Sequence, residues 1–316
     1  MSKRRLRVGV LDVESGHLHG SWFEEQLTAR WPDLEVALKA LGSRPRRAGR
    51  SGQGRRIPIR EFYSEPIYRA LVDGKIDIGV HRMKDLPAPL PDDVQLVAVT
   101  ERKTPLDVLV TADGSILDEL PAGARIGVSS RRREAQLNRY RRDLSIEFIV
   151  GTLSERLEMV TAGKLDGVVI AAAGIEWRGW QERVAEVFTA QVCLPAVGQA
   201  ALGILVGAGA AEGLVEKLRF LNEPLSRQEV DAERAYYVAL GAWEGSPVGG
   251  LARVKGDILR IDGCVCSLDG REILRAWAEG FPDDPLRTGE RLAQQLLEQG
   301  AGEMLARARE EVGIVG

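Results

Sequence analysis

The sequence predicts an α/β protein with two lobes of similar build, followed by a separate α+β domain. A helical pattern, a Gly-Lys-aliphatic-Asp turn and an apolar strand occur at residues 62–80 and again at 157–170. The two copies are about ninety residues apart, a spacing that fits one lobe each. Any turn between a helix and a parallel strand favours Gly, Lys and Asp, so this short match also has a simpler explanation. After residue 224 the pattern changes to strands followed by helices, which is typical of an α+β domain.

The composition is that of an ordinary globular protein. The 316 residues are 44 % hydrophobic and 28 % charged, with room for two or three domains. A net charge of −3 argues against a nucleic-acid partner, and no apolar run approaches the roughly twenty residues of a membrane span. The three cysteines form neither a disulfide framework nor a Cys-x-x-Cys motif. We therefore expect a reduced, cytoplasmic monomer without a metal or a signal peptide.

The first lobe begins with a β-α-β pattern. Its expected elements are a strand at 6–11, a loop at 12–20, a helix at 22–30 and a strand at 34–41. His17 and His19 follow two acidic residues in the expected loop, which is either a metal site or simply polar.

Residues 43–60 differ in kind from the rest of the lobe. Seven arginines alternate there with Gly, Ser and Pro: Arg44, Arg46, Arg47, Arg50, Arg55, Arg56 and Arg60. Such a segment has too few apolar groups to order itself, which favours a solvated loop. A lid over an anionic ligand is the functional alternative. An RNA-binding arm is less favoured because no aromatic residue is interleaved for base stacking.

In the first lobe, two charged residues directly follow an expected buried strand. Residues 77–81 are mostly apolar, and Lys84 and Asp85 follow directly before Pro87. Because ligands of open α/β sheets bind at the carboxyl ends of strands, this pair is a candidate site.

The second lobe offers a candidate anion site. A strand expected at 94–100 still belongs to the first lobe. In the second lobe strands are expected at 107–110, 125–128 and 146–150, and a capping box at 152–155 opens a helix. Ser129 or Ser130 can cap a helix whose first turn carries Arg131, Arg132 and Arg133. Free N–H groups and three cations there suit an anion, although a solvated face remains the alternative.

The C-terminal region has its own order of elements. We expect a helix at 226–240, strands at 254–260, 260–267 and 273–279, a helix at 287–299 and another helix beyond residue 302.

Four motifs resemble those of the porphobilinogen deaminases, also called hydroxymethylbilane synthases. They are His-x-Met-Lys-Asp within 77–87, Gly-Val-Ser-Ser-x-Arg-Arg at 127–133, Leu-Pro-Ala-Val-Gly-Gln at 194–199 and Ala-Glu-Arg-Ala at 232–235. The resemblance covers almost the whole chain. It implies two lobes like those of periplasmic binding proteins, with double crossovers at 101–104 and 194–199. The implied domains are lobe 1 at 1–101 and 199–222, lobe 2 at 102–198, and an α+β domain at 223–316.

The resemblance also implies a function. The family is a class of transferase in tetrapyrrole (porphyrin and heme) biosynthesis, and it joins four porphobilinogen units with loss of ammonia. The position of the family's catalytic aspartate is Asp85. The positions that match substrate-binding residues are Lys84, Ser129, Ser130, Arg132, Arg133, Arg156 and Gln199.

The chain departs from the family at the cofactor anchor. The family attaches a dipyrromethane to a cysteine, and Glu244 stands at that position, so no covalent cofactor is expected there. Arg82 replaces a serine of the aspartate motif, and Trp177 replaces an arginine. Cys193, Cys264 and Cys266 are either replacement anchors or small buried hydrophobes.

The sequence is compatible with two functions. One is a divergent enzyme that acts on porphobilinogen or a linear pyrrole, with its primer held non-covalently or absent. The other is a non-catalytic or repurposed homologue that binds an anionic small molecule or a protein partner between the lobes.

Overall fold

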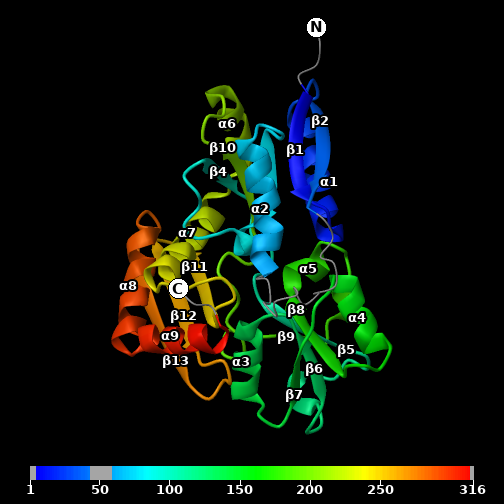
Figure 1. The fold of residues 1–316 in the computed structure, drawn as a ribbon, viewed down its shortest axis with the longest axis vertical. Coiled ribbons are helices and arrows are strands. Elements are labelled where there is room, and N and C mark those ends of the chain that lie inside the picture. The colour runs from blue at the N-terminus through cyan, green and yellow to red at the C-terminus, as the bar shows by residue number, and fades with distance from the viewer. Residues whose placement is uncertain (1–4, 43–58, 314–316) are drawn as a thin grey trace. The chain divides into compact units, whose positions relative to one another are not determined.

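A computed structural model describes residues 5–42 and 59–313. The chain divides into two compact units, Met1–Arg102 with Ala201–Arg227, and Lys103–Ala200 with Gln228–Gly316 (Figure 1). The three-domain boundaries inferred from the sequence stay a prediction. Most of the arginine-rich segment expected at 43–60 lies outside the described residues.

The first unit is built on one five-stranded sheet. Its elements are β1 (Arg5–Leu11), α1 (Glu14–Arg30), β2 (Glu35–Leu41), α2 (Ile59–Val72), β3 (Ile78–Arg82), the 3-10 helix η1 (Met83–Asp85), β4 (Val94–Val99), β10 (Leu202–Gly207), α6 (Glu212–Leu218) and η4 (Arg219–Leu221). The strand order is β2-β1-β3-β10-β4. β1 is parallel to β2 and β3, whereas β10 is antiparallel to β3 and β4.

A second sheet of the same topology begins the second unit. Its elements are β5 (Asp107–Thr111), η2 (Leu117–Glu119), β6 (Arg125–Val128), α3 (Arg131–Tyr140), β7 (Ser145–Phe148), α4 (Leu153–Thr161), β8 (Gly167–Ala171), α5 (Ala172–Glu176), η3 (Gln181–Arg183) and β9 (Glu186–Val187). The order β7-β6-β8-β5-β9 repeats that of the first sheet, again with an antiparallel fourth strand. The two similar lobes expected from the sequence are therefore confirmed.

The repeated turn is preserved down to its side chains. In the first unit Arg7 Nη2 donates to Asp77 Oδ1 at 2.7 Å, and Arg7 Nη1 donates to the carbonyl of the turn's glycine. In the second unit Arg125 Nε contacts Asp166 Oδ2 at 3.3 Å, and Nη2 again donates to the glycine carbonyl. An arginine of β1 thus fixes the turn before β3 in the first unit, and an arginine of β6 fixes the turn before β8 in the second.

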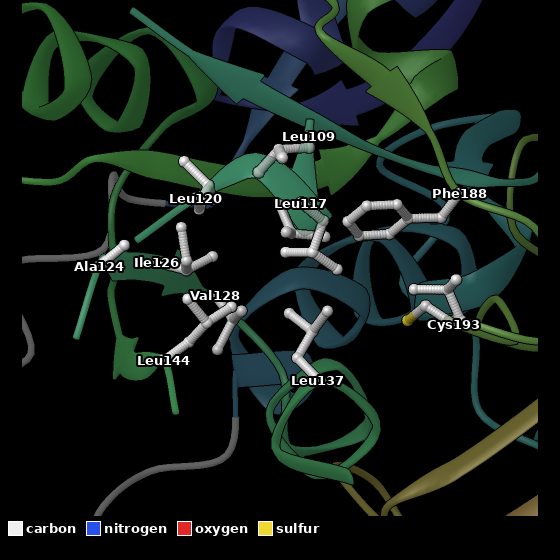
Figure 2. Packing of buried hydrophobic residues seen from close by; sticks show 12 residues of the cluster. Leu109, Leu117, Leu120, Ala124, Ile126, Val128, Leu137, Leu144, Phe188 and Cys193 are labelled. Atoms are coloured by element: carbon white, nitrogen blue, oxygen red, sulfur yellow. The ribbon is translucent and has the colours of Figure 1, made fainter. Parts of the chain in front are cut away.

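An apolar core fills one side of the second sheet. Leu109 of β5 and Ile126 of β6 pack with Leu137 of α3, and the ring of Phe188 lies beside Leu117 (Figure 2). This core holds α3, which carries the arginine motif, against the sheet.

The C-terminal part is α+β, as expected. It contains α7 (Pro224–Ala239), β11 (Val248–Lys255), β12 (Ile258–Cys266), β13 (Ile273–Gly280), α8 (Pro285–Glu298) and α9 (Ala301–Glu311). The strands form an antiparallel sheet in the order β11-β12-β13. The strand expected at 254–260 was wrong, because a tight turn at Gly256, with φ of 60°, lies within that span.

The expected loop at 12–20 was also wrong, because α1 already begins at Glu14. The helix was not predicted there because two residues of its buried face are glycines, which do not contribute to an apolar pattern in the sequence. Gly16, His19, Gly20 and Phe23 form the buried face of the helix, and a Cβ at Gly16 would lie 2.1 Å from the carbonyl oxygen of Leu11. Glycine is therefore the residue that lets α1 pack directly on the end of β1.

Substituting Gly16 should test this close approach. Gly16→Ala is expected to lower the free energy of unfolding by at least about 2 kcal/mol, because backbone atoms would have to move. The control Gly213→Ala, at an open position of α6, should raise it by up to about 1 kcal/mol. Urea denaturation of the two variants measures the difference. Equal stabilities would contradict the packing described for α1.

Candidate active site

The aspartate motif lies at the carboxyl end of β3. The strand residues 78–81 are buried, and Met83, also buried, receives a hydrogen bond on its carbonyl from Leu86. A Cβ at Gly203 of β10 would lie 2.6 Å from Met83 Sδ, so glycine there makes room for the motif. η1 then presents Lys84 and Asp85, both half-buried, next to each other.

Asp85 forms an ion pair with Arg82, three residues earlier. Arg82 Nε lies 2.5 Å from Asp85 Oδ2, and the side chains are 31 % and 15 % exposed. The carboxylate is thus largely shielded from water, which strengthens its interaction with any charge nearby.

The arginine motif converges on Asp107, a fully buried residue at the start of β5. Arg132 Nη2 lies 2.8 Å from Oδ2, and Arg133 Nη2 lies 2.8 Å from Oδ1. Both arginine side chains are buried as well. The three charges therefore compensate one another away from water, as buried charges require.

The pair of arginines controls the ionisation of Asp107. Burial alone would raise the pKa of this carboxyl group, but the charges and hydrogen bonds of Arg132 and Arg133 outweigh it and hold the pKa far below its usual range. Burial likewise opposes the charge of Arg132, yet Asp107 raises the pKa of this guanidinium above its ordinary value. Asp107 and Arg132 are therefore both charged throughout the physiological range.

The second crossover segment joins the same cluster. Gln199 Nε2 donates to Asp107 Oδ1 at 2.8 Å and to the carbonyl of Pro105 at 2.6 Å. Arg132 Nη1 donates to the carbonyl of Leu194 at 2.5 Å. Asp107 thereby connects the two crossovers with α3. Substrate binding by Arg132, Arg133 and Gln199 stays a prediction, because in this structure each of them donates to a buried carboxylate.

The serines take two different roles. Ser130 is the N-cap of α3, as expected, and its Oγ accepts from the N–H of Arg133 at 3.3 Å. Ser129 Oγ accepts from Arg156 Nη1 at 2.8 Å and from Arg133 Nη1 at 3.3 Å. Arg156 follows the capping box at the start of α4, which is confirmed with Thr152 as N-cap. The structure thus brings Ser129, Arg133 and Arg156 together.

Glu244, which the sequence comparison with the family motif predicts to stand at the anchor position, lies in the turn between α7 and β11. Its side chain is half-buried and its Oε1 atom is shielded from solvent. Next to it, Trp243 lies under the guanidinium of Arg309, 5.3 Å from the ring centre, and its carbonyl accepts from the Tyr237 hydroxyl. A carboxylate cannot form a thioether, so these residues do not fit a dipyrromethane attached at this position.

The three cysteines are free and buried. Burial raises the pKa of the Cys193 thiol to about 12, which leaves it protonated and weakly nucleophilic. Cys264 and Cys266 lie on β12 within a small apolar cluster that also contains Leu194. Burial thus withholds all three thiols from a ligand in solution in this structure.

The described residues hold neither a cluster of metal ligands nor a helix that could cross a membrane. His17 contacts Asp12 at 3.3 Å, while His19 is buried on α1. Nowhere in the described ranges do three His, Cys, Asp or Glu side chains gather as metal ligands would. None of the helices in those ranges has the length and apolar character needed to cross a bilayer.

Asp107 is the site residue that the sequence did not identify. The sequence indicated only that a strand starts there. In the sequence, Asp107 directly precedes the apolar residues Val108 to Val110 of the expected strand. Because an acidic residue in a buried strand needs cationic partners, this position could have been predicted to bind basic side chains.

Comparison with known proteins defines the class of protein. A family model described as "Porphobilinogen deaminase, dipyromethane cofactor binding domain" matches residues 51–213. The porphobilinogen deaminase of Pelotomaculum thermopropionicum is 38 % identical, over 98 % of this chain and 98 % of that protein. That of Moorella thermoacetica is 37 % identical over the same shares, and that of Syntrophus aciditrophicus is 42 % identical over 76 % and 78 %.

The chain therefore belongs to the porphobilinogen deaminase family, whose members are transferases of tetrapyrrole biosynthesis. Among solved structures, it is similar to a putative methionine-binding lipoprotein of Bacillus subtilis, with a TM-score of 0.43 and 12 % identity over 69 % of this chain and 90 % of that one. It is also similar to the periplasmic aliphatic sulphonate binding protein of Escherichia coli, with a TM-score of 0.42 and 16 % identity over 75 % of each chain.

Removing the Asp107 charge should expose its structural role. Asp107→Asn is expected to lower the free energy of unfolding by about 3–5 kcal/mol, because two buried arginines lose their counter-charge. Asp143→Asn is the control, since its ion pair with Arg141 reaches solvent and should matter much less. Guanidinium denaturation at pH 7 measures both variants.

The same experiment has a defined pH dependence. The folded-state pKa of Asp107 lies below its unfolded value of about 3.9, so its contribution is complete above that pH and is lost as the pH falls. The stability difference between wild type and Asp107→Asn should thus be constant from pH 8 to pH 5 and narrow below about pH 4. A difference that does not depend on pH would contradict this assignment.

Proposed function

We propose that this chain condenses porphobilinogen units with loss of ammonia, as a cytoplasmic hydroxymethylbilane synthase-type transferase without a thioether-bound dipyrromethane at residue 244. The observation that carries the proposal is Asp85. It keeps the family's aspartate position and lies, largely shielded from water, at the carboxyl end of β3. A homologue that only binds a ligand has no need of this acid.

The chemistry required of Asp85 is electrostatic. Loss of ammonia from porphobilinogen leaves a cationic methylene-pyrrole, and a neighbouring carboxylate offsets its charge and accepts hydrogen bonds from pyrrole N–H groups. Because Asp85 is only 15 % exposed, its charge acts in a medium of lower dielectric than water. The carboxylate is already in place, so little reorganisation accompanies the reaction.

The acetate and propionate groups of the substrate require cations. Lys84 lies beside Asp85 and supplies a flexible ammonium, whereas Arg156 supplies a planar guanidinium next to Ser129. The proposed site also includes four residues that hold the start of α3 and the second crossover segment in place: Ser130, Arg132, Arg133 and Gln199. Their direct contact with substrate is part of the proposal.

Initiation of the chain must differ from the family pattern. With Glu244 in the anchor turn, the first pyrrole unit is held non-covalently or no primer is used. The carboxylate of Glu244 also repels the carboxylates of a growing chain at short range.

A second candidate function is a non-catalytic homologue that binds an anionic small molecule or a protein partner. Glu244 favours it, as does the ion pair of Arg82 with Asp85, which compensates the charge of the acid in the resting protein. Consumption of porphobilinogen distinguishes the two candidates, because only the transferase removes ammonia from it.

The Asp85→Asn variant tests the assigned role. Its rate of porphobilinogen consumption should fall at least about a hundredfold, since the amide cannot offset a cation. The matched control Asp92→Asn, an exposed residue of the same unit, should keep the wild-type rate. Ammonia release and tetrapyrrole absorbance report on turnover. An Asp85→Asn variant with the full rate would remove Asp85 from the mechanism.

The Glu244→Cys variant tests the anchor position. If Glu244 alone prevents attachment, this variant should gain a covalent dipyrromethane after exposure to porphobilinogen, visible in the intact mass of the denatured protein. Glu244→Gln removes the same charge without supplying a thiol and should gain no mass. An unchanged mass for Glu244→Cys would mean that other residues of the turn, such as Trp243, also prevent attachment.

A further inference from the structure

The ion pair between Arg82 and Asp85 is not explained by packing alone. Arg82 Nε and Asp85 Oδ2 are atoms shielded from solvent, although the Arg82 side chain as a whole is 31 % exposed. The two residues are separated by one turn of a 3-10 helix, so their backbone positions are fixed relative to each other. The guanidinium is therefore held at the carboxylate by local structure, not by a chance surface contact.

The backbone around Arg82 is held from both sides. Arg82 is the last residue of β3 and pairs in register with Leu202 of β10. The N–H of Met83 donates to the carbonyl of Ala201 at 3.0 Å, and the ring of His81 contacts the carbonyl of Arg82 through Nδ1 at 3.0 Å. A side chain that starts from so constrained a position can orient its partner.

Few other charges come from the described parts of the elements packed around Asp85. β10 contributes only apolar residues, and α2 packs against η1. The ionisable groups in the described parts of β3, η1 and α2 are His81, Arg82, Lys84, Glu65, Tyr68 and Arg69. Glu65 and Arg69 pair with each other at the surface. Removal of Arg82 consequently leaves Lys84 as the cation nearest to Asp85 in sequence.

We infer that Arg82 is a positioning residue of the proposed active site, which keeps the Asp85 carboxylate ionised and holds its Oδ2 atom in place. The inference rests on the proposed function, since it concerns the residue assigned there as catalytic. Arg82 acts through Asp85 and forms no bond with substrate. An opposite charge at this distance favours the ionised carboxylate, typically by 1–3 pKa units.

The test compares Arg82→Gln with Arg82→Lys in the full chain. Arg219→Gln is the matched control, because Arg219 pairs with Glu216, also three residues away, but both side chains are exposed. Carbon-13 NMR of protein labelled at the aspartate carboxyl carbons follows the titration of Asp85, with Asp85→Asn to assign its signal. The pH dependence of kcat/KM for porphobilinogen is measured on the same variants.

In Arg82→Gln the pKa of Asp85 should rise by about one unit or more, and the acid limb of kcat/KM should move to higher pH by the same amount. Arg82→Lys should restore most of both shifts, while Arg219→Gln should change neither. An Asp85 titration that is the same in Arg82→Gln and wild type would overturn the inference, whether or not the protein turns over. A raised pKa in a protein that consumes no porphobilinogen would instead overturn the proposed function and, with it, the catalytic part of this role.

Discussion

The buried carboxylate of Asp107 between two buried arginines is the constraint on which the second lobe depends. A charge so far from water persists only when partners of opposite sign surround it. Arg132 and Arg133 come from the first turn of α3, and Gln199 is the last residue of the second crossover segment. One side chain at the start of β5 therefore holds the helix and the second crossover segment of this unit together.

The buried cluster around Asp107 gives the arginine motif a structural role that does not depend on catalysis. Arg132 and Arg133 match family positions, but a chain that had lost its activity would still need them to compensate Asp107. Their retention is therefore weak evidence for catalysis. Asp85 is stronger evidence, because it lies in a short 3-10 helix at the carboxyl end of a strand, and no buried cluster of described residues like that around Asp107 requires it.

Local patterns in the sequence were sufficient for much of the fold. The Gly-Lys-aliphatic-Asp turn predicted the repeated lobe, because the helix, the turn and the strand of this unit are neighbours in sequence. The N-caps at Ser130 and Thr152 are likewise determined by residues within one turn of the helix start. The start of α1 was missed because Gly16 and Gly20 make a buried helix face that does not register as apolar. Asp107 was missed because its partners lie 25 and 26 residues away, and no local pattern reports such a contact.

We propose that this family member builds tetrapyrrole without the thioether anchor. The most direct measurement is the intact mass of the wild-type chain, denatured during turnover of porphobilinogen, together with the tetrapyrrole formed. We expect consumption of porphobilinogen, a linear or cyclised tetrapyrrole product, and a chain with the mass of its unmodified sequence. Absence of consumption at high protein concentration, or a pyrrole adduct that survives denaturation of the wild type, would contradict it.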